Sequence, residues 1–313
     1  MDGVKIICVG TTLEQWENNP LIKFKSTLNE DTAEISKKKF ATYKGLSFIV
    51  KPKLKSKGFN LIIRGSIAQY YNNGKDNAFD YDFDMLKQTI NELCEKFNIN
   101  HKTAIIQHLE IGVNISLDKN IDSILSGLIA YQNDIFTHPT PKGKFNGKEI
   151  YRQEYRYKIY DKGLMINKAH KNLLRIEFAA KSRKYLRKHN IEVLADILNI
   201  DNLNSLKAEL IDFWQNTIFH SDKMQFDKMT NQQHIKWLTL CDPTHWEKIN
   251  RSQRFRAKKR FQQLKNQFST TRTQEKILQM IKDKFKDLSI ENTINTNQSL
   301  HNTQNKSVTL YAM

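Results

Sequence analysis

Two glutamates stand in the middle of segments with the alternating apolar and polar pattern of β-strands, where a carboxylate is locally unfavourable. Glu110 lies in the segment 108–115 and Glu177 in the segment 173–179. If these two strands are neighbours, the carboxylates converge and can bind a hard divalent cation such as Mg²⁺ or Mn²⁺, which prefers oxygen ligands. His108 shares a strand face with Glu110 and is a candidate third ligand.

An alternative interpretation gives both glutamates a structural role. Arg175 lies on the same strand face as Glu177, and Lys158 and Lys162 share one face of a third alternating segment, 156–162. Cross-strand ion pairs with these cations would hold the glutamates on a solvated surface. The sequence leaves both the metal site and the ion pairs open.

A candidate nucleophile follows the second glutamate by eight residues. Tyr185 lies in a short predicted helix after Ser182, a favourable N-cap residue, and its phenol oxygen could attack a metal-bound phosphate. A free phenol, with a pKa of about 10, is a weak nucleophile at pH 7. Cationic surroundings lower the cost of forming phenolate. The cations near Tyr185, which could also bind DNA phosphates, are Lys181, Arg183, Lys184, Arg187 and Lys188.

Four residues on the neighbouring segments are further candidates for the same chemistry. Lys162 could add a positive charge at a scissile phosphate, or it could be a solvent-facing strand lysine. Arg175 is a candidate DNA contact. Tyr160 and Tyr157 are the alternative nucleophiles, although Tyr157 lies on the apolar face of its strand and is better explained as a core residue.

The pattern around these residues predicts an α+β fold. The segment 58–65 is typical of a strand, and apolar residues spaced at i, i+4, i+7 and i+11 predict a helix over 83–97. Strands with one apolar and one polar face are typical of an antiparallel sheet that helices cover on one face. After Ser182 the chain is predicted to be helical, until a polar stretch, 289–313, that is predicted to be disordered. Whether residues 1–57 join the sheet is left open.

Positive charge is concentrated in two blocks of the 313-residue chain, which has 50 Lys and Arg, 33 Asp and Glu, and a formal net charge of +17. Residues 142–190 carry 15 cations against 4 anions, and residues 248–286 carry 13 against 2. Because neutralised phosphates release counterions, such blocks favour a polyanionic partner. A solvated, lysine-rich surface is the alternative.

Within the second block, residues 251–261 interleave aromatic residues with cations on one long predicted helix. Such a helix could lie along DNA phosphates or in a groove of a duplex. It could instead form a dimer and expose a solvated basic face. The cations that we expect to contact DNA are Arg254, Arg256, Lys258 and Lys259.

Several protein classes are excluded because their motifs are missing. The chain has no GxxxxGK[ST] loop for an ATPase and no GxSxG motif for a serine hydrolase, and none of its nine histidines has an arginine three residues later, as a tyrosine recombinase would. Its three cysteines fit neither a disulfide framework nor a zinc cluster. Without an apolar run near 18 residues or a signal-peptide layout, we expect a soluble cytoplasmic protein with no membrane partner.

Four segments, in this order, resemble the motifs of a known family. They are IRGSIAQYYNNGKDN (63–77), HLEIGVNI (108–115), YKIYDKG (157–163) and LLRIEFAAKSRKYL (173–186). Over roughly residues 60–215 the chain resembles phage and plasmid rolling-circle replication initiators of the filamentous-phage gene II type, which are related to the trans-acting plasmid Rep initiators. The resemblance implies a nicking domain similar to those of Rep and HUH endonucleases.

In that family a tyrosine nicks one strand of a double-strand origin, becomes joined to the 5′-phosphate and leaves a 3′-OH that primes replication. The resemblance implies that Tyr185 is the nucleophile and Glu177 a metal ligand. It also implies that Glu110 occupies the acidic position of the earlier strand.

These observations together predict a metal-dependent DNA nicking endonuclease and strand transferase that initiates rolling-circle replication in a bacterial host cell. The expected organisation is a nicking domain over 1–190, a helical region for DNA binding or dimerisation over 191–288, and the disordered tail. The expected partners are the double-strand origin, its nicked single strand, Mg²⁺ or Mn²⁺, and a host helicase and polymerase, with a homodimer left open. The competing hypothesis is a non-catalytic DNA- or RNA-binding protein that uses the two basic blocks.

Overall fold

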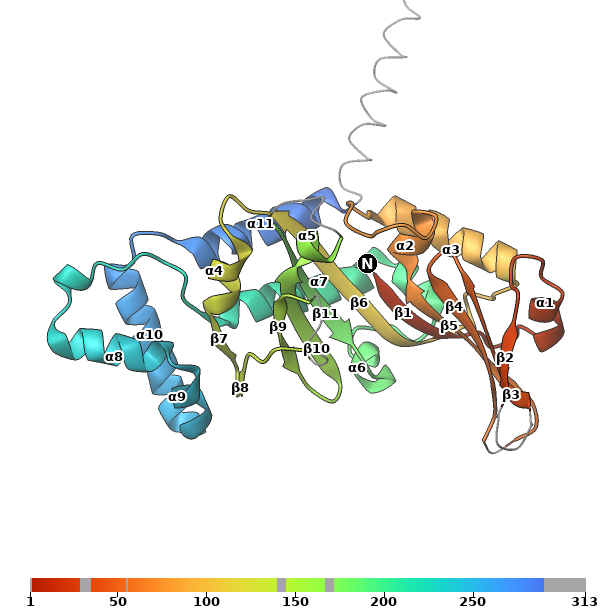
Figure 1. The fold of residues 1–313 in the computed structure, drawn as a ribbon, viewed down its shortest axis with the longest axis horizontal. Coiled ribbons are helices and arrows are strands. Elements are labelled where there is room, and N and C mark those ends of the chain that lie inside the picture. The colour runs from red at the N-terminus through yellow and green to blue at the C-terminus, as the bar shows by residue number, and fades with distance from the viewer. Residues whose placement is uncertain (1, 29–34, 55, 140–144, 167–171, 290–313) are drawn as a thin grey trace, which may run out of the picture.

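A nine-stranded antiparallel sheet forms the body of the protein (Figure 1). The structure is a computed structural model that describes residues 2–28, 35–54, 56–139, 145–166 and 172–289. The strand order is β2-β3-β4-β5-β1-β6-β11-β10-β9. The strands are β1 (Gly3–Ile7), β2 (Lys25–Leu28), β3 (Ile35–Tyr43), β4 (Leu46–Pro52), β5 (Phe59–Ser66), β6 (Ile105–Ser116), β9 (Gly147–Tyr151), β10 (Tyr155–Asp161) and β11 (Leu173–Ala180).

A smaller three-stranded sheet and a set of helices surround this sheet. The small sheet has the order β12-β7-β8 and contains β7 (Leu128–Tyr131), β8 (Asp134–Ile135) and β12 (Ile218–Phe219). The α-helices are α1 (Leu13–Glu17), α2 (Ile67–Tyr71), α3 (Phe83–Phe97), α4 (Ile121–Ser126), α5 (Lys162–Met165), α6 (Arg183–Arg187), α7 (Ile200–Asn216), α8 (Asn231–Cys241), α9 (Pro243–Lys248), α10 (Arg251–Phe268) and α11 (Thr273–Asp287). Within the described ranges, none of the helices combines the length and apolar character that crossing a bilayer requires.

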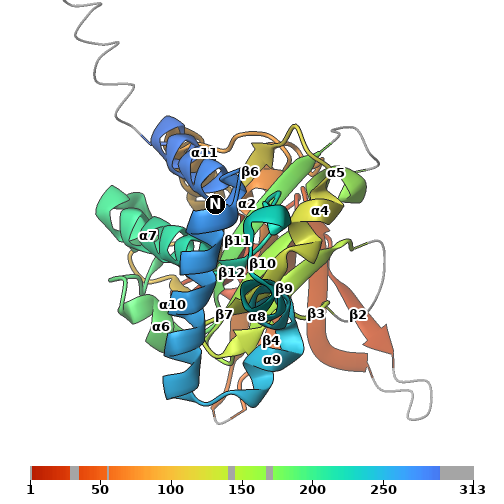
Figure 2. The same ribbon diagram turned by 90° about the vertical axis from the view of Figure 1, so that its left-hand side faces the viewer.

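Period-two alternation assigns one face of the large sheet to the core. On β11, Ile176 and Phe178 are fully buried among apolar residues of one cluster, which also contains Val113 of β6 and Ile6 of β1. Helices α3, α7 and α11 contribute apolar residues to the same cluster. Figure 2 shows α7 and α11 on the same side of β6 and β11. The opposite face of these strands carries the polar residues that form the site described below.

The structure agrees with the predicted coarse fold, an antiparallel sheet with helices packed on it. Helix α3 has the predicted bounds, 83–97, and Asp82 caps it by accepting a hydrogen bond from the Met85 amide at 2.8 Å. The first 57 residues join the sheet, because β1 to β4 lie within them. Strand β1 is central, since it pairs with β5 on one side and with β6 on the other.

The C-terminal region differs from the predicted all-helical unit over 191–288. Helices α7 and α11 complete the core of the large sheet, so residue 190 is not a boundary in the packing. The sequence predicts helices throughout this region, but α7 ends at Asn216, and the β-formers Ile218 and Phe219 pair with β7. Helices α8 to α10 pack on the small sheet in a second apolar cluster, at one end of the molecule (Figure 1). Apart from Ser289, the predicted disordered tail lies outside the described residues.

The second cluster should unfold locally without loss of the large sheet. Phe261 of α10 is 2% exposed and stacks on Trp237 of α8 with ring centroids 5.1 Å apart. We expect Phe261→Ala to cost about 3–5 kcal/mol and to accelerate amide hydrogen exchange in α8 to α10. The exposed Phe255 on the same helix is the matched control, and Phe255→Ala should leave exchange unchanged. Equal acceleration in β6 and β11 would show that the two clusters unfold together.

Candidate functional site

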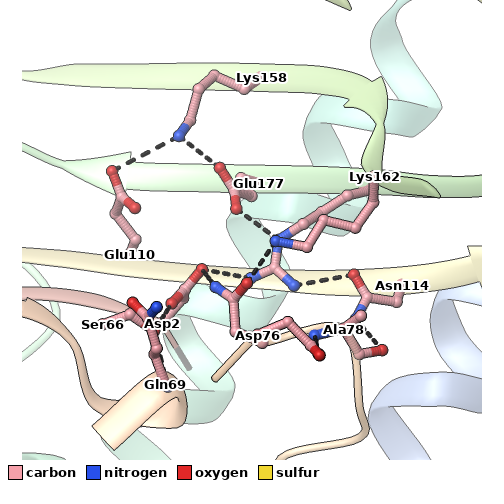
Figure 3. A network of polar contacts seen from close by, with 12 residues as sticks. Asp2, Ser66, Gln69, Asp76, Ala78, Glu110, Asn114, Lys158, Lys162 and Glu177 are labelled. Atoms are coloured by element: carbon pink, nitrogen blue, oxygen red, sulfur yellow. Dashed lines mark hydrogen bonds and ion pairs between the residues drawn. The ribbon is translucent and has the colours of Figure 1, made fainter. Parts of the chain in front are cut away.

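Three carboxylates converge on the polar face of the large sheet. One oxygen each from Asp2, Glu110 and Glu177 lies within 4.8 Å of the other two (Figure 3). Glu110 is on β6 and Glu177 on β11, and Asp2 immediately precedes β1, so the three come from adjacent strands. The strands of the two glutamates are therefore neighbours, as convergence of the two carboxylates requires. No sequence pattern around Asp2 predicts a site residue there, so its place in the carboxylate group becomes visible only when β1 pairs with β6 in the tertiary structure.

Two glycines make room for these carboxylates. Gly112 faces Glu177 across the ladder between β6 and β11. A Cβ at Gly112 would lie 2.9 Å from Glu177 Cγ and 2.8 Å from the Ile176 carbonyl oxygen, so a side chain there would displace the carboxylate or the strand. A Cβ at Gly3 would lie 2.5 Å from Glu110 Oε2. The close approach of the acidic groups therefore depends on the absence of side chains at these two positions.

Two cations, the buried Arg175 and the partly buried Lys158, form ion pairs with the three carboxylates (Figure 3). Arg175 donates to Glu177 Oε1, to Asp2 Oδ2 at 2.9 Å and to Asn114 Oδ1 at 2.8 Å. Lys158 Nζ lies 2.5 Å from Glu177 Oε2 and 3.8 Å from Glu110 Oε1. The cross-strand ion pairs that the sequence offered as the alternative to a metal site are thus present. Glu177 and Arg175, however, are buried and not on a solvated surface.

This pairing controls the charge state of Glu177. Burial alone would raise the pKa of its carboxyl group, but the charges of Arg175 and Lys158 outweigh burial and hold that pKa below its ordinary value. Glu177 is therefore an anion at neutral pH despite being 1% exposed. A buried carboxylate with two cationic partners is a strong hydrogen-bond acceptor. Its removal would lower the free energy of unfolding, because the cations would stay buried without this partner.

A tyrosine phenol contacts the same carboxylate. Tyr160 lies directly opposite Arg175 in the ladder between β10 and β11, and its Oη donates to Glu177 Oε1 at 2.8 Å. Burial and the negative charge of Glu177 raise the pKa of Tyr160 well above its ordinary value, so the phenol is protonated at neutral pH. The ring is 4% exposed and lies 4.8 Å, centroid to centroid, from Phe145. Sequence reasoning ranked this residue only as an alternative nucleophile.

His108 and Lys162 lie at the edge of the cluster. His108 is outside the group of three carboxylates, and its Nε2 lies 3.2 Å from Glu110 Oε1. Lys162 begins α5 instead of continuing the strand as predicted, because Asp161 caps that helix through the Leu164 amide. Its ammonium donates to the Asn77 side chain, and burial, with a further contribution from Arg175, lowers the pKa of Lys162.

The structure does not bring Tyr185 to the carboxylates. Ser182 caps α6 as predicted, but the helix packs on the apolar face of β11, where the Tyr185 ring lies 5.7 Å from the ring of Phe178. Glu177 projects from the opposite face of that strand. Burial and the nearby Glu209 carboxylate raise the pKa of Tyr185, as burial and Glu177 do for Tyr160, so the face of the sheet, and not the phenol pKa, separates the two tyrosines. The predicted nucleophile is thus a core residue in this structure, 6% exposed.

The cations predicted around Tyr185 have other partners. Glu154 and Glu192 form exposed ion pairs with four of them, at N···O distances of 2.9 to 3.9 Å, and the four are Arg183, Lys184, Arg187 and Lys188. Lys181 Nζ lies 3.4 Å from the centroid of the Tyr151 ring. Arg175, predicted to contact DNA, is instead buried in the carboxylate cluster, because three acceptors already surround its guanidinium.

One of the four α10 cations predicted to contact DNA is structural. Arg254 donates to the carbonyl oxygens of Trp246 and Ile249 and so fixes the end of α9 against α10. The remaining cations lie on the exposed surface of α10, and they are Arg256, Lys258 and Lys259.

Comparisons with known proteins found a distant structural similarity and no match in sequence. No family model and no curated protein matches the chain. Among solved structures, a rolling circle replication initiator protein from Geobacillus stearothermophilus aligns with 10% identity over 74% of this chain and 89% of that chain, with a TM-score of 0.36. A similarity at this level does not define the fold or the activity of the chain.

Loss of the Glu177 charge should destabilise the protein strongly. We expect Glu177→Gln to lower the free energy of unfolding at pH 7 by about 3–5 kcal/mol, because Arg175 would lose a buried partner. The folded pKa of Glu177 lies below the unfolded value of about 4.3, so its contribution is present above that pH and is lost as the pH falls toward the folded value. Urea unfolding at several pH values measures both effects.

An exposed ion pair supplies the control for that experiment. Lys87 Nζ lies 2.6 Å from Asp84 Oδ1 on the surface of α3. Asp84→Asn should change the free energy of unfolding by less than about 1 kcal/mol. A Glu177→Gln effect as small as this would contradict the structural role of the buried cluster.

Proposed function

We propose that this protein is a metal-dependent DNA nicking and strand-transfer enzyme of rolling-circle replication, with Tyr160 as its nucleophile. The observation that supports this proposal best is the 2.8 Å hydrogen bond from Tyr160 Oη to Glu177, within a group of three convergent carboxylates. A phenol beside oxygen ligands for a hard cation is the arrangement that covalent phosphoryl transfer needs. The resemblance of four sequence segments to rolling-circle initiators supports the same reaction.

The three carboxylates fit a divalent cation. Asp2, Glu110 and Glu177 offer hard oxygen ligands within 4.8 Å of one another, as Mg²⁺ or Mn²⁺ prefers. When bound, such an ion would polarise the scissile phosphate and stabilise charge that develops on it. The Lys158 ammonium now lies between Glu110 and Glu177, so we infer that metal binding requires this side chain to move aside.

The chain's own residues can carry out the transfer. The Tyr160 oxygen attacks the phosphorus, the bond to the 3′-oxygen breaks, and a tyrosyl 5′-phosphate and a free 3′-OH result. Glu177 orients the attacking oxygen by accepting the phenol hydrogen bond, the phenol proton passes to solvent, and water protonates the leaving 3′-oxygen. Arg175 holds Glu177 and Asp2 in position through its hydrogen bonds to both carboxylates. Attack by a 3′-OH on the tyrosyl phosphate reverses these steps and transfers the strand.

The biological role that we propose is initiation at a double-strand origin in the cytoplasm of a bacterial host. A host helicase and polymerase would act on the nicked strand, because the chain has no GxxxxGK[ST] loop for an ATPase of its own. The exposed cations of α10 would contact origin DNA, and α10 could also form a homodimer.

One observation favours the competing function, a non-catalytic nucleic-acid-binding protein. Tyr160 is 4% exposed, and Arg175 and Lys158 already form ion pairs with the carboxylates. A protein that only binds would form no covalent adduct with DNA under any metal condition.

Covalent capture tests the nucleophile. Incubation of supercoiled origin DNA with the protein and Mg²⁺ or Mn²⁺ should give a protein–DNA adduct on a denaturing gel. We expect Tyr160→Phe to remove the adduct, at least a hundredfold, because the attacking oxygen is gone. Tyr185→Phe, across the sheet, should form it at the wild-type level. An adduct that persists in Tyr160→Phe and disappears in Tyr185→Phe would identify Tyr185 as the nucleophile. Absence of the adduct in the wild type would favour the non-catalytic nucleic-acid-binding protein.

Metal binding should improve when Lys158 is neutralised. We expect Lys158→Gln to tighten Mn²⁺ binding, measured by calorimetry, by at least about tenfold, because a fixed positive charge near two ligands is removed. Lys5→Gln, which removes a charge from the same sheet face without vacating the space between the carboxylates, should change the affinity less than threefold. Unchanged affinity in Lys158→Gln would contradict a metal site at these carboxylates.

A further inference from the structure

We propose that a basic hollow beside the carboxylate cluster binds single-stranded DNA. The hollow has a volume of 660 Å³ and lies on the polar face of the large sheet. Its lining comes from β5, β1, β6, β11, β10 and β9 and from residues 181–183, which follow β11. This volume lies within the range of about 300–1,000 Å³ that ligand sites occupy.

Two cations at one end of the hollow lack a compensating charge. Lys5 of β1 and Arg64 of β5 lie directly opposite each other in the antiparallel ladder. Like charges in this position destabilise a sheet. In the part of the chain that the structure describes, no ion pair joins either cation to a carboxylate. His108, on the other side of Lys5, extends the polar row. Phosphate oxygens over this row would relieve the repulsion.

The opposite end of the hollow offers an aromatic surface. Tyr151 of β9 is 61% exposed, and Lys181 Nζ lies 3.4 Å from its ring centroid. An exposed tyrosine beside a cation is suited to stacking an unpaired base while the cation contacts the adjacent phosphate. Bases in a duplex are already stacked on each other, so this surface favours a single strand.

The two ends are far enough apart to contact several nucleotides. Strands β5, β1, β6, β11, β10 and β9 are consecutive in the sheet. Five inter-strand spacings correspond to about 24 Å between Arg64 and Tyr151. Two further cations, Arg156 and Arg183, line the hollow, and each has an acidic partner, so they contribute less net charge than Lys5 and Arg64.

The hollow leads directly to the proposed catalytic cluster. Glu110 belongs both to the lining of the hollow and to the group of three carboxylates. A strand that lies across the sheet from Arg64 to Tyr151 therefore passes the carboxylates. The choice of DNA over RNA rests on the proposed nicking function. The hollow and its charges are observed independently of that function.

Binding of a fluorescein-labelled eight-nucleotide oligothymidylate, measured by anisotropy in EDTA, tests this inference with the full-length protein. We expect Lys5→Gln and Arg64→Gln each to weaken binding at least about threefold and to reduce the salt slope by about 0.7 for each lost phosphate contact. Tyr151→Leu should weaken binding at least about fivefold, as the loss of one stacked base predicts. Tyr151→Phe keeps the ring and should bind within twofold of the wild type.

A surface lysine outside the hollow supplies the control. Lys184 on α6 has an 80% exposed side chain, and Lys184→Gln should bind within twofold of the wild type. Wild-type binding by the Lys5 and Arg64 variants, or equal loss with Lys184→Gln, would overturn the hollow as the site. Equal loss with Tyr151→Phe and Tyr151→Leu would overturn base stacking, and tighter binding of oligouridylate would overturn the choice of DNA. Because EDTA prevents metal-dependent cleavage, the assay measures binding alone. A protein that fails to nick DNA can therefore still show the expected binding by the hollow.

Discussion

The pairing of Arg175 with Glu177 in the centre of the large sheet is the constraint on which the site depends. Removing two charges from water costs several kcal/mol for each ion, and only close partners offset that cost. Here the partners come from several strands: Asp2 at the start of β1, Asn114 on β6 and Lys158 on β10. The sheet therefore has to be assembled in one register before the charges are satisfied, and that register also fixes Tyr160 against Glu177.

The same interactions set the conditions for chemistry. Glu177 stays ionised because Arg175 and Lys158 stabilise its negative charge, and Tyr160 stays protonated because it is buried beside that charge. In a resting site of this kind the carboxylates are already paired with cations of the protein, and Tyr160 is buried. Our proposal requires that DNA and a divalent cation replace contacts that the protein now makes with itself, above all those of Lys158. The free energy for that exchange would come from phosphate contacts such as those available in the basic hollow.

The position of Tyr185 shows why spacing along the chain is a weak guide to a site in a sheet. The side chains of Glu177 and Phe178 project from opposite faces of β11, so a helix that follows the strand can pack on either face. The apolar residues of α6 direct it to the core, where Tyr185 contacts Phe178 and Tyr155. Its cationic neighbours in sequence then point to solvent and pair with Glu154 and Glu192. Local charge density along the chain therefore did not indicate which tyrosine lies beside Glu177.

By itself, the sequence determined the strands around Glu110 and Glu177, the helix over 83–97 and the polar face that both glutamates share, because period-two and period-3.6 patterns are local. It also limited the partners of Glu177 to a cation or a metal. Only the tertiary structure decided that Asp2 joins the cluster, that Lys158 and Arg175 are its counter-charges, and that α7 and α11 complete the sheet's core. Those outcomes depend on which strands become neighbours and which face each helix covers, and pairing between distant segments leaves no periodic signal in either one.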